Sequence, residues 1–161
     1  MPQSLTPQRT FRAVAVAETV TWTLLIAAMI IKYGLDGGDL PVRVAGSVHG
    51  FVFLSYAVTA VVVALNQRWS VPVTAVGVLS AIVPYMTVPF ERTVERRGML
   101  EGVWRTSTTD DPRDHTLVGR LLRWMLVHPA LFAALLLVVV TVVMTVLLAL
   151  GPPGEWRSHA A

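Results

Sequence analysis

One acidic side chain interrupts an otherwise apolar stretch near the start of the sequence. Glu18 lies within Ala13–Tyr33, and the other apolar stretches contain neither a carboxylate nor an arginine. A charge at the centre of a membrane-spanning helix costs about 2.5–3.5 kcal/mol, so such residues usually face other helices and find a partner. Glu18 is therefore a candidate proton or cation site. A carboxyl group that fixes helix packing through a hydrogen bond is the more common alternative.

A histidine in the next apolar stretch invites a metal or haem hypothesis. Axial haem ligation needs a second ligand, and His128 is the only other histidine near a membrane surface. At 1.5 Å per residue, His49 should lie about 10 Å from the nearer helix end, whereas His128 belongs at a surface. This mismatch favours a neutral, hydrogen-bonded packing histidine, and we expect no cofactor.

Depth along the helices also indicates which side chains can meet. Counted from the first turn between helices, Glu18 lies about 22 Å along one helix and His49 about 10 Å along the next. The two side chains should therefore not contact each other. Tyr56 shares the level of Glu18 and Tyr85 that of His49, which makes both tyrosines candidate partners.

Glycine and proline mark packing positions. Gly46 and Gly50 form a GxxxG motif, which permits close helix contact either within a bundle or against a partner protein. Pro84 and Pro89 lack the backbone N–H that a helix interior requires, so we expect the helix over Val71–Phe90 to bend. A static kink is more common than a gate.

No signature of an enzyme accompanies these residues. The chain has no cysteine, and it carries no phosphate-binding loop, nucleophile elbow or cluster of metal ligands. Its 13 basic residues are scattered among apolar runs, which argues against nucleic-acid binding. We therefore expect a protein without catalytic activity.

The elements that must position these residues are four apolar segments. The 161 residues are 54% apolar and 14% charged, with a mean hydropathy of +0.61, whereas soluble domains carry about 25% charged residues. About 20 apolar residues are needed to span a bilayer. The sequence thus predicts an all-α bundle of four transmembrane helices, at Ala13–Tyr33, Val44–Leu65, Val71–Phe90 and Ala130–Leu150.

Three regions follow from this pattern: a three-helix membrane domain over 1–97, a polar loop over 98–129, and a fourth helix with a short polar tail over 130–161. The stretch Ser107–Asp114 is typical of an exposed loop. After it, leucines recur at helical spacing beside Arg120 and Arg123. That pattern fits a short basic amphipathic helix in the headgroup region, or the solvated start of the fourth helix.

Basic residues indicate the orientation, because they prefer cytoplasmic loops. Four crossings would place nine basic residues on the side of the long loop, and Lys32 and Arg43 of the first turn are two of these nine. The other side would hold four: Arg9, Arg12, Arg68 and Arg157. This count predicts a multi-pass protein of a bacterial plasma membrane with the Glu91–His128 loop in the cytoplasm and both termini outside.

The residues over about 11–97 also resemble a known family. Its pattern has a glutamate early in the first helix, a Lys-Tyr pair closing that helix, a His-Gly pair in the second, a tryptophan in the next turn and a late proline in the third. Here these are Glu18, Lys32, Tyr33, His49, Gly50, Trp69 and Pro84. Ile31 stands where the family would have proline. The chain thus resembles domain-of-unknown-function family 3817, and the resemblance implies a small bacterial integral membrane protein without an assigned activity.

Two classes of function remain after these exclusions. A small chain with few intramembrane polar groups and a GxxxG face is typical of an accessory subunit that binds a larger membrane complex. The alternative is a proton- or cation-coupled transporter or channel subunit that uses Glu18 and assembles as a homo-oligomer. In both cases the lipid bilayer is the immediate surrounding.

Overall fold

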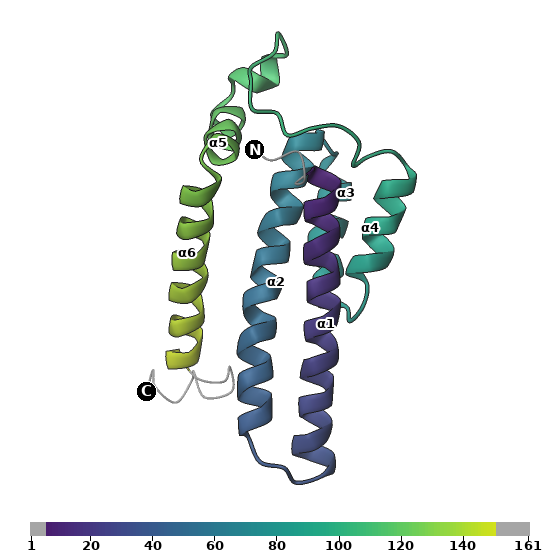
Figure 1. Ribbon diagram of the computed structural model, residues 1–161, viewed down its shortest axis with the longest axis vertical. Helices are drawn as coiled ribbons and strands as arrows, with labels where there is room; N and C mark the ends of the chain where they lie inside the picture. Colours follow the sequence, from purple (N-terminus) through teal and green to yellow (C-terminus); the bar gives the residue numbers. More distant parts are fainter. Residues whose placement is uncertain (1–5, 151–161) are drawn as a thin grey trace.

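A computed structural model describes residues 6–150, apart from the side chains of residues 113, 144, 147, 148 and 150. All regular elements in this range are helices, which confirms the expected all-α class. They are α1 (Pro7–Gly34), α2 (Leu40–Gln67), α3 (Val71–Leu79), the 3-10 helix η1 (Ser80–Ile82), α4 (Thr87–Arg96), the 3-10 helix η2 (Pro112–His115), α5 (Leu117–Val127) and α6 (Pro129–Leu150) (Figure 1).

Helices α1 and α2 form a long antiparallel hairpin (Figure 1). Each has 28 residues, or about 42 Å, enough to cross a bilayer. Both are apolar enough to do so, and they agree with the first two expected spans. A Cβ atom added to Gly46 would lie 3.9 Å from Leu25. The first glycine of the GxxxG motif therefore packs within the hairpin.

The third apolar segment does not form the continuous, bent helix that the sequence predicted. Helix α3 and η1 end at Ile82, and a new helix begins at Thr87. The break has a clear cause, because a residue before proline is pushed out of the α region. Val83 is accordingly extended (φ −98°, ψ 121°), and Tyr85 adopts a positive φ of 66°.

The expected bend at Pro89 is also absent, for a different reason. Pro89 is the third residue of α4, where backbone N–H groups have no partner within the helix. Its missing N–H therefore costs little, and α4 runs on to Arg96. Figure 1 shows that α4 runs back toward the end of the molecule where α3 begins. We call residues 71–96 the re-entrant pair.

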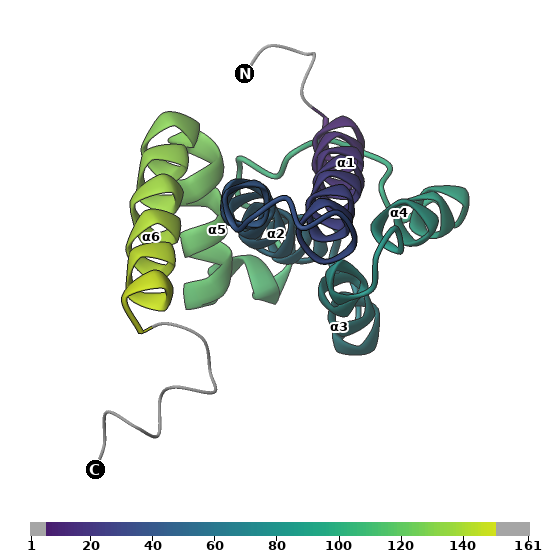
Figure 2. The same cartoon turned by 90° about the horizontal axis from the view of Figure 1, so that it is seen from below.

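Helices α5 and α6 are separate elements. The angle between them is 104° across His128, so α5 lies across one end of the hairpin while α6 runs alongside α2 (Figures 1 and 2). Leu122 and Leu126 of α5 are buried against Val62, whereas Arg120 is exposed and Arg123 is half-buried. This arrangement supports the interfacial amphipathic helix over the simple start of a fourth span. With α5 and α6 taken as one bent span, the described residues offer up to three crossings.

The re-entrant pair changes which loops share a side. The long loop after α4 lies at the end where α1 begins and α2 ends, opposite the turn between α1 and α2 (Figure 1). The expected grouping of Lys32 and Arg43 with this loop is therefore wrong, because the third segment returns instead of crossing. The same change places the end of α6 opposite the start of α1.

Candidate intramembrane polar site

Glu18 lies in the contact between α1 and the start of α4. Its side chain is fully buried, at 0% exposure. The Oε2 atom accepts a hydrogen bond of 2.9 Å from the hydroxyl of Thr87, the first residue of α4. The same hydroxyl lies 3.1 Å from the carbonyl oxygen of Ala15, a second possible acceptor. The carboxyl group thus ties α1 to the point where the re-entrant pair turns back.

The other carboxyl oxygen of Glu18 has no hydrogen-bond partner among the described residues, although it is buried. Buried polar atoms are nearly always hydrogen-bonded, so an unpaired one calls for an explanation. The N-terminus of α4 contributes a partial positive charge beside the carboxyl group. No cluster of three or more potential metal ligands occurs among the described residues.

A second buried carboxylate, which the sequence analysis missed, lies on α4 one helical turn after Thr87. Glu91 is 1% exposed, and its Oε1 lies 3.5 Å from the Nε atom of Arg12 on α1. Arg12 also reaches Glu95 at 3.3 Å, and Gln8 donates to Glu95 at 2.6 Å. Because Glu91 follows the third apolar segment directly, it looked like a surface residue. Only the reversal of α4 brings it back against α1.

His49 is packed and hydrogen-bonded, as its more common role predicted. Its Nδ1 lies 3.0 Å from the hydroxyl of Thr21, and its ring centroid lies 4.4 Å from that of Trp22. The Thr21 hydroxyl also lies 2.9 Å from the backbone carbonyl of Glu18, and the tautomer of His49 sets which of the two side chains donates in the bond between them. The side chains of Glu18 and His49 bind different partners, in agreement with the depth argument.

The two tyrosines do not partner Glu18 or His49. Tyr56 is fully buried but faces α3, where its hydroxyl lies 3.1 Å from the carbonyl of Gly77 and 3.0 Å from Ser80 Oγ. Tyr85 is exposed and accepts a hydrogen bond of 3.4 Å from Thr23. Matching by depth therefore did not identify partners for Glu18 and His49: Tyr56 is turned toward α3, and Tyr85 lies in the break between η1 and α4, outside any helix.

The remaining candidates lie away from Glu18. Lys32 closes α1 with an ion pair of 2.9 Å to Asp39 across the turn. Pro84 belongs to the break between η1 and α4. Gly50 is half-buried in α2, one turn after Gly46. The structure thus does not gather the predicted residues into one site.

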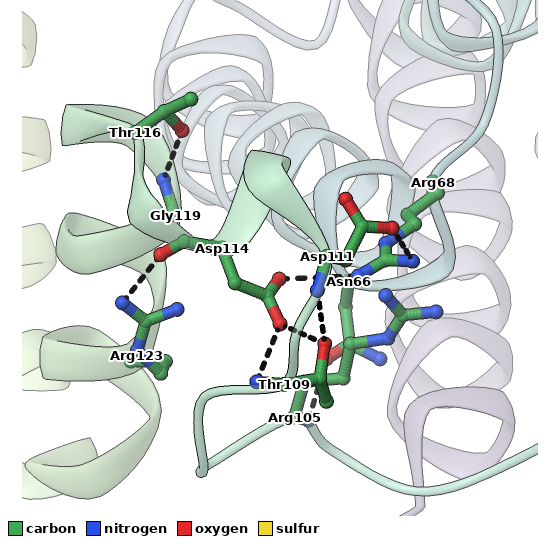
Figure 3. Close-up of polar contacts among 9 residues, drawn as sticks. All are labelled: Asn66, Arg68, Arg105, Thr109, Asp111, Asp114, Thr116, Gly119 and Arg123. Carbon is green, nitrogen blue, oxygen red and sulfur yellow. Dashed lines mark hydrogen bonds and ion pairs between the residues drawn. The ribbon is translucent and has the colours of Figure 1, made fainter.

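A further polar cluster fastens the long loop to the end of α2 (Figure 3). Arg68 forms ion pairs with Asp111 and Asp114. Asp114 also accepts hydrogen bonds from the hydroxyl and backbone N–H of Thr109, at 2.6 and 3.0 Å. The Thr109 hydroxyl bond is the main reason that the pKa of Asp114 falls to about 2. The expectation of a wholly exposed loop over Ser107–Asp114 is therefore wrong at its end, where Asp114 is buried.

The loop is held at two more points. The Asn66 side chain accepts a hydrogen bond of 2.8 Å from the backbone N–H of Arg105. Arg123 of α5 donates to the carbonyl oxygen of Asp114 at 2.6 Å. These contacts connect α2, the loop and α5, so the orientation of α5 depends on them.

Comparison with known proteins points in the same direction as the fold. A family model described as "Domain of unknown function (DUF3817)" matches residues 8–96. The putative membrane protein SCO5905 of Streptomyces coelicolor is 37% identical over 93 residues, 57% of this chain and 11% of that protein. The uncharacterized membrane protein YdzA of Bacillus subtilis is 33% identical over 69 residues, 43% of this chain and 71% of that protein. No solved structure matches.

Proposed function

The chain belongs to the DUF3817 family of membrane proteins, and on this premise we propose that it is an accessory subunit without catalytic activity. In this role it binds a larger complex within the membrane. The observation that supports the proposal is the use of its interior polar groups. Most of these polar groups form hydrogen bonds between two helices of this chain, so few polar groups remain to bind a substrate.

These contacts span the core. Glu18 bonds to Thr87 between α1 and α4, Thr21 to His49 between α1 and α2, and Tyr56 to Ser80 between α2 and η1. Apolar side chains meanwhile cover the outer faces of the spans, Val20 and Leu24 on α1 among them. Interhelical hydrogen bonds fix how membrane helices pack. A rigid, apolar-faced body of this kind suits a binding partner better than a transport path.

The unpaired oxygen of Glu18 favours one alternative, a proton-coupled transport subunit. Intramembrane carboxylates often serve as proton relays, and transporters place such groups at breaks in their helices. Glu18 lies at the break in the re-entrant pair and has a free acceptor atom. Proton transfer through Glu18 would require an opening that exposes this fully buried group.

One substitution separates the two functions. Glu18→Gln keeps the shape and the oxygen that accepts from Thr87, but it cannot ionise. Because interhelical hydrogen bonds contribute only about 0.6 kcal/mol on average, we expect the variant to fold and to co-purify with the same partner as the wild type in stoichiometric amounts. Mass spectrometry of complexes isolated from native membranes measures this.

The matched measurement is proton flux into liposomes that contain the purified full chain. The accessory role predicts flux equal to that of empty liposomes for both proteins. A wild-type flux that disappears in Glu18→Gln, while assembly is unchanged, would replace the accessory role with proton transport. A homo-oligomer without any partner protein would point the same way.

The corrected arrangement of loops leads to a revised orientation. Ten basic residues lie at the end that holds the start of α1 and the long loop, and two, Lys32 and Arg43, lie toward the other. The first group comprises Arg9, Arg12, Arg68, Arg92, Arg96, Arg97, Arg105, Arg113, Arg120 and Arg123. By the preference of basic residues for the cytoplasm, we propose that the long loop and the start of α1 are both cytoplasmic in a bacterial plasma membrane.

Cysteine labelling tests this orientation without background, because the chain has no cysteine. Leu35→Cys and Ser107→Cys each introduce one thiol at an exposed position, in the α1–α2 turn and in the long loop. We expect a membrane-impermeant maleimide to label the first on intact cells and the second only after permeabilisation. Labelling of both from the same side would show that residues 71–96 cross the membrane after all.

A further inference from the structure

A groove of about 740 Å³ opens between α3 and α5, with the end of α2 as its floor. Its walls are largely apolar: Leu65 of α2, Val71, Ala75, Val78 and Leu79 of α3, and Val118 and Leu122 of α5. Three arginines and one aspartate line its polar end, where the long loop crosses. The groove therefore has a charged end, where the long loop crosses, and an apolar remainder between the helices. This division matches the charged headgroup and apolar chains of an amphiphile.

The charge at the polar end favours an anion. Arg68 is paired with Asp111 and Asp114. Arg123 donates to a neutral backbone carbonyl, and Arg105 has no ion pair among the described residues. Neither of these two guanidinium groups forms an ion pair among the described residues, and they lie on opposite sides of Asp114 (Figure 3). Guanidinium groups bind phosphate oxygens in pairs of parallel hydrogen bonds.

A second compartment of about 380 Å³ continues the groove beneath α5. All of its lining residues are apolar, and it shares Leu65, Val78, Val118 and Leu122 with the first. Two adjoining apolar compartments below one basic end match the two acyl chains of a phospholipid. We propose that this groove binds an anionic phospholipid, with its headgroup at the end lined by Arg105 and Arg123 and its acyl chains along α3 and beneath α5.

The position of the groove favours a lipid over a soluble phosphate compound. Basic pockets between helices near a membrane surface bind anionic lipid headgroups. Here α5 is amphipathic and lies across the hairpin end, with Leu121 and Trp124 exposed. A soluble anion would use the two arginines but leave both apolar compartments without an occupant. A bound lipid would also fill the space that separates α5 from α3.

Lipid binding to the purified full chain tests this proposal. Native mass spectrometry in detergent would compare dioleoylphosphatidylglycerol with zwitterionic dioleoylphosphatidylcholine. We expect phosphatidylglycerol to bind at least tenfold more tightly. Arg105→Gln should weaken that binding about tenfold, the effect of one lost charged hydrogen bond. The double variant with Arg123→Gln should bind both lipids alike.

Two control variants separate charge from shape. Arg120→Gln removes an exposed charge from α5 outside the groove, and it should bind phosphatidylglycerol like the wild type. Ala75→Phe fills the apolar wall and keeps every arginine, so it should weaken binding, whereas Ala27→Phe on the outer face of α1 should not.

Three outcomes would overturn the proposal. These are equal affinity for the two lipids, full binding by Arg105→Gln, and displacement of phosphatidylglycerol by an equal concentration of sn-glycerol 3-phosphate. The last result would show a site for a soluble anion. None of these measurements depends on the role of Glu18.

Discussion

Phe11→Ala is expected to destabilise the protein by about 2–4 kcal/mol. Phe11 is fully buried at the Arg68 end of the bundle, among side chains of α1, α2 and the re-entrant pair. Its ring centroid lies 5.6 Å from that of Tyr56, 5.8 Å from Trp69 and 6.2 Å from Phe90. Each aromatic pair contributes about 0.5–1.5 kcal/mol beyond buried area, and the alanine would leave a cavity.

The cost should lie below the upper limit for soluble proteins, where Phe→Ala costs about 3–5 kcal/mol. Part of that cost is the transfer of the ring from water, which is smaller when the unfolded helices stay in lipid or detergent. Titration with sodium dodecyl sulfate in mixed micelles, followed by circular dichroism, measures the free energy of unfolding.

Leu24→Ala is a suitable control for this substitution. Leu24 lies on the same helix and is 52% exposed on its outer face, so its truncation should change stability by less than about 0.5 kcal/mol. Equal effects of the two substitutions would show that the aromatic cluster around Phe11 is not the core of the fold.

The first two helices could be predicted from the sequence because hydropathy directly reflects their surroundings. α1 and α2 are long and apolar and are joined by a short glycine-rich turn, and each exceeds the length of about 20 residues that a span needs. The amphipathic pattern of α5 was equally informative. Its buried face carries Leu122 and Leu126, which pack against the bundle, and Arg120 lies on the exposed side.

The third segment shows where such reasoning fails. Hydropathy counts apolar residues but does not distinguish one helix of 20 residues from two short helices that reverse direction. The deciding feature is local: Pro84 makes Val83 extended, and Tyr85 then adopts a positive φ. The sequence analysis interpreted Pro84 as the site of a bend. A bend and a reversal differ only in the backbone angles of Val83 and Tyr85, which the sequence does not give.

The wrong prediction for the third segment also made the predicted site and the predicted orientation wrong. With a crossing helix, Glu91 would lie at the membrane surface opposite Arg12. The reversal instead places Glu91 against Arg12 and brings Thr87 to Glu18. Buried partners of this kind depend on tertiary structure, and one sequence without a known fold does not contain a signal for them. Helix rotation, which turns Tyr56 toward α3, is hidden in the same way.

A glycine outside the GxxxG motif provides the sharpest test of the re-entrant pair. Gly77 of α3 is buried, and a Cβ atom there would lie 2.9 Å from two ring carbons of Phe90 on α4. No side chain fits at that distance unless the ring moves, and the ring is held by Phe11 and Trp69. We therefore expect Gly77→Leu to cost at least about 1–3 kcal/mol through overpacking.

Alanine at two positions isolates this contact from helix propensity. In a helix interior, alanine is more favourable than glycine by about 1 kcal/mol of folding free energy. Gly46→Ala should gain most of that, because its new methyl group would lie 3.9 Å from Leu25. Gly77→Ala should gain less or lose stability, since Phe90 must shift. The same detergent titration gives both values. If Gly77→Ala were stabilised as much as Gly46→Ala, and Gly77→Leu unfolded like the wild type, α3 and α4 would not pack through Gly77, and a crossing helix over residues 71–90 would again describe the third segment.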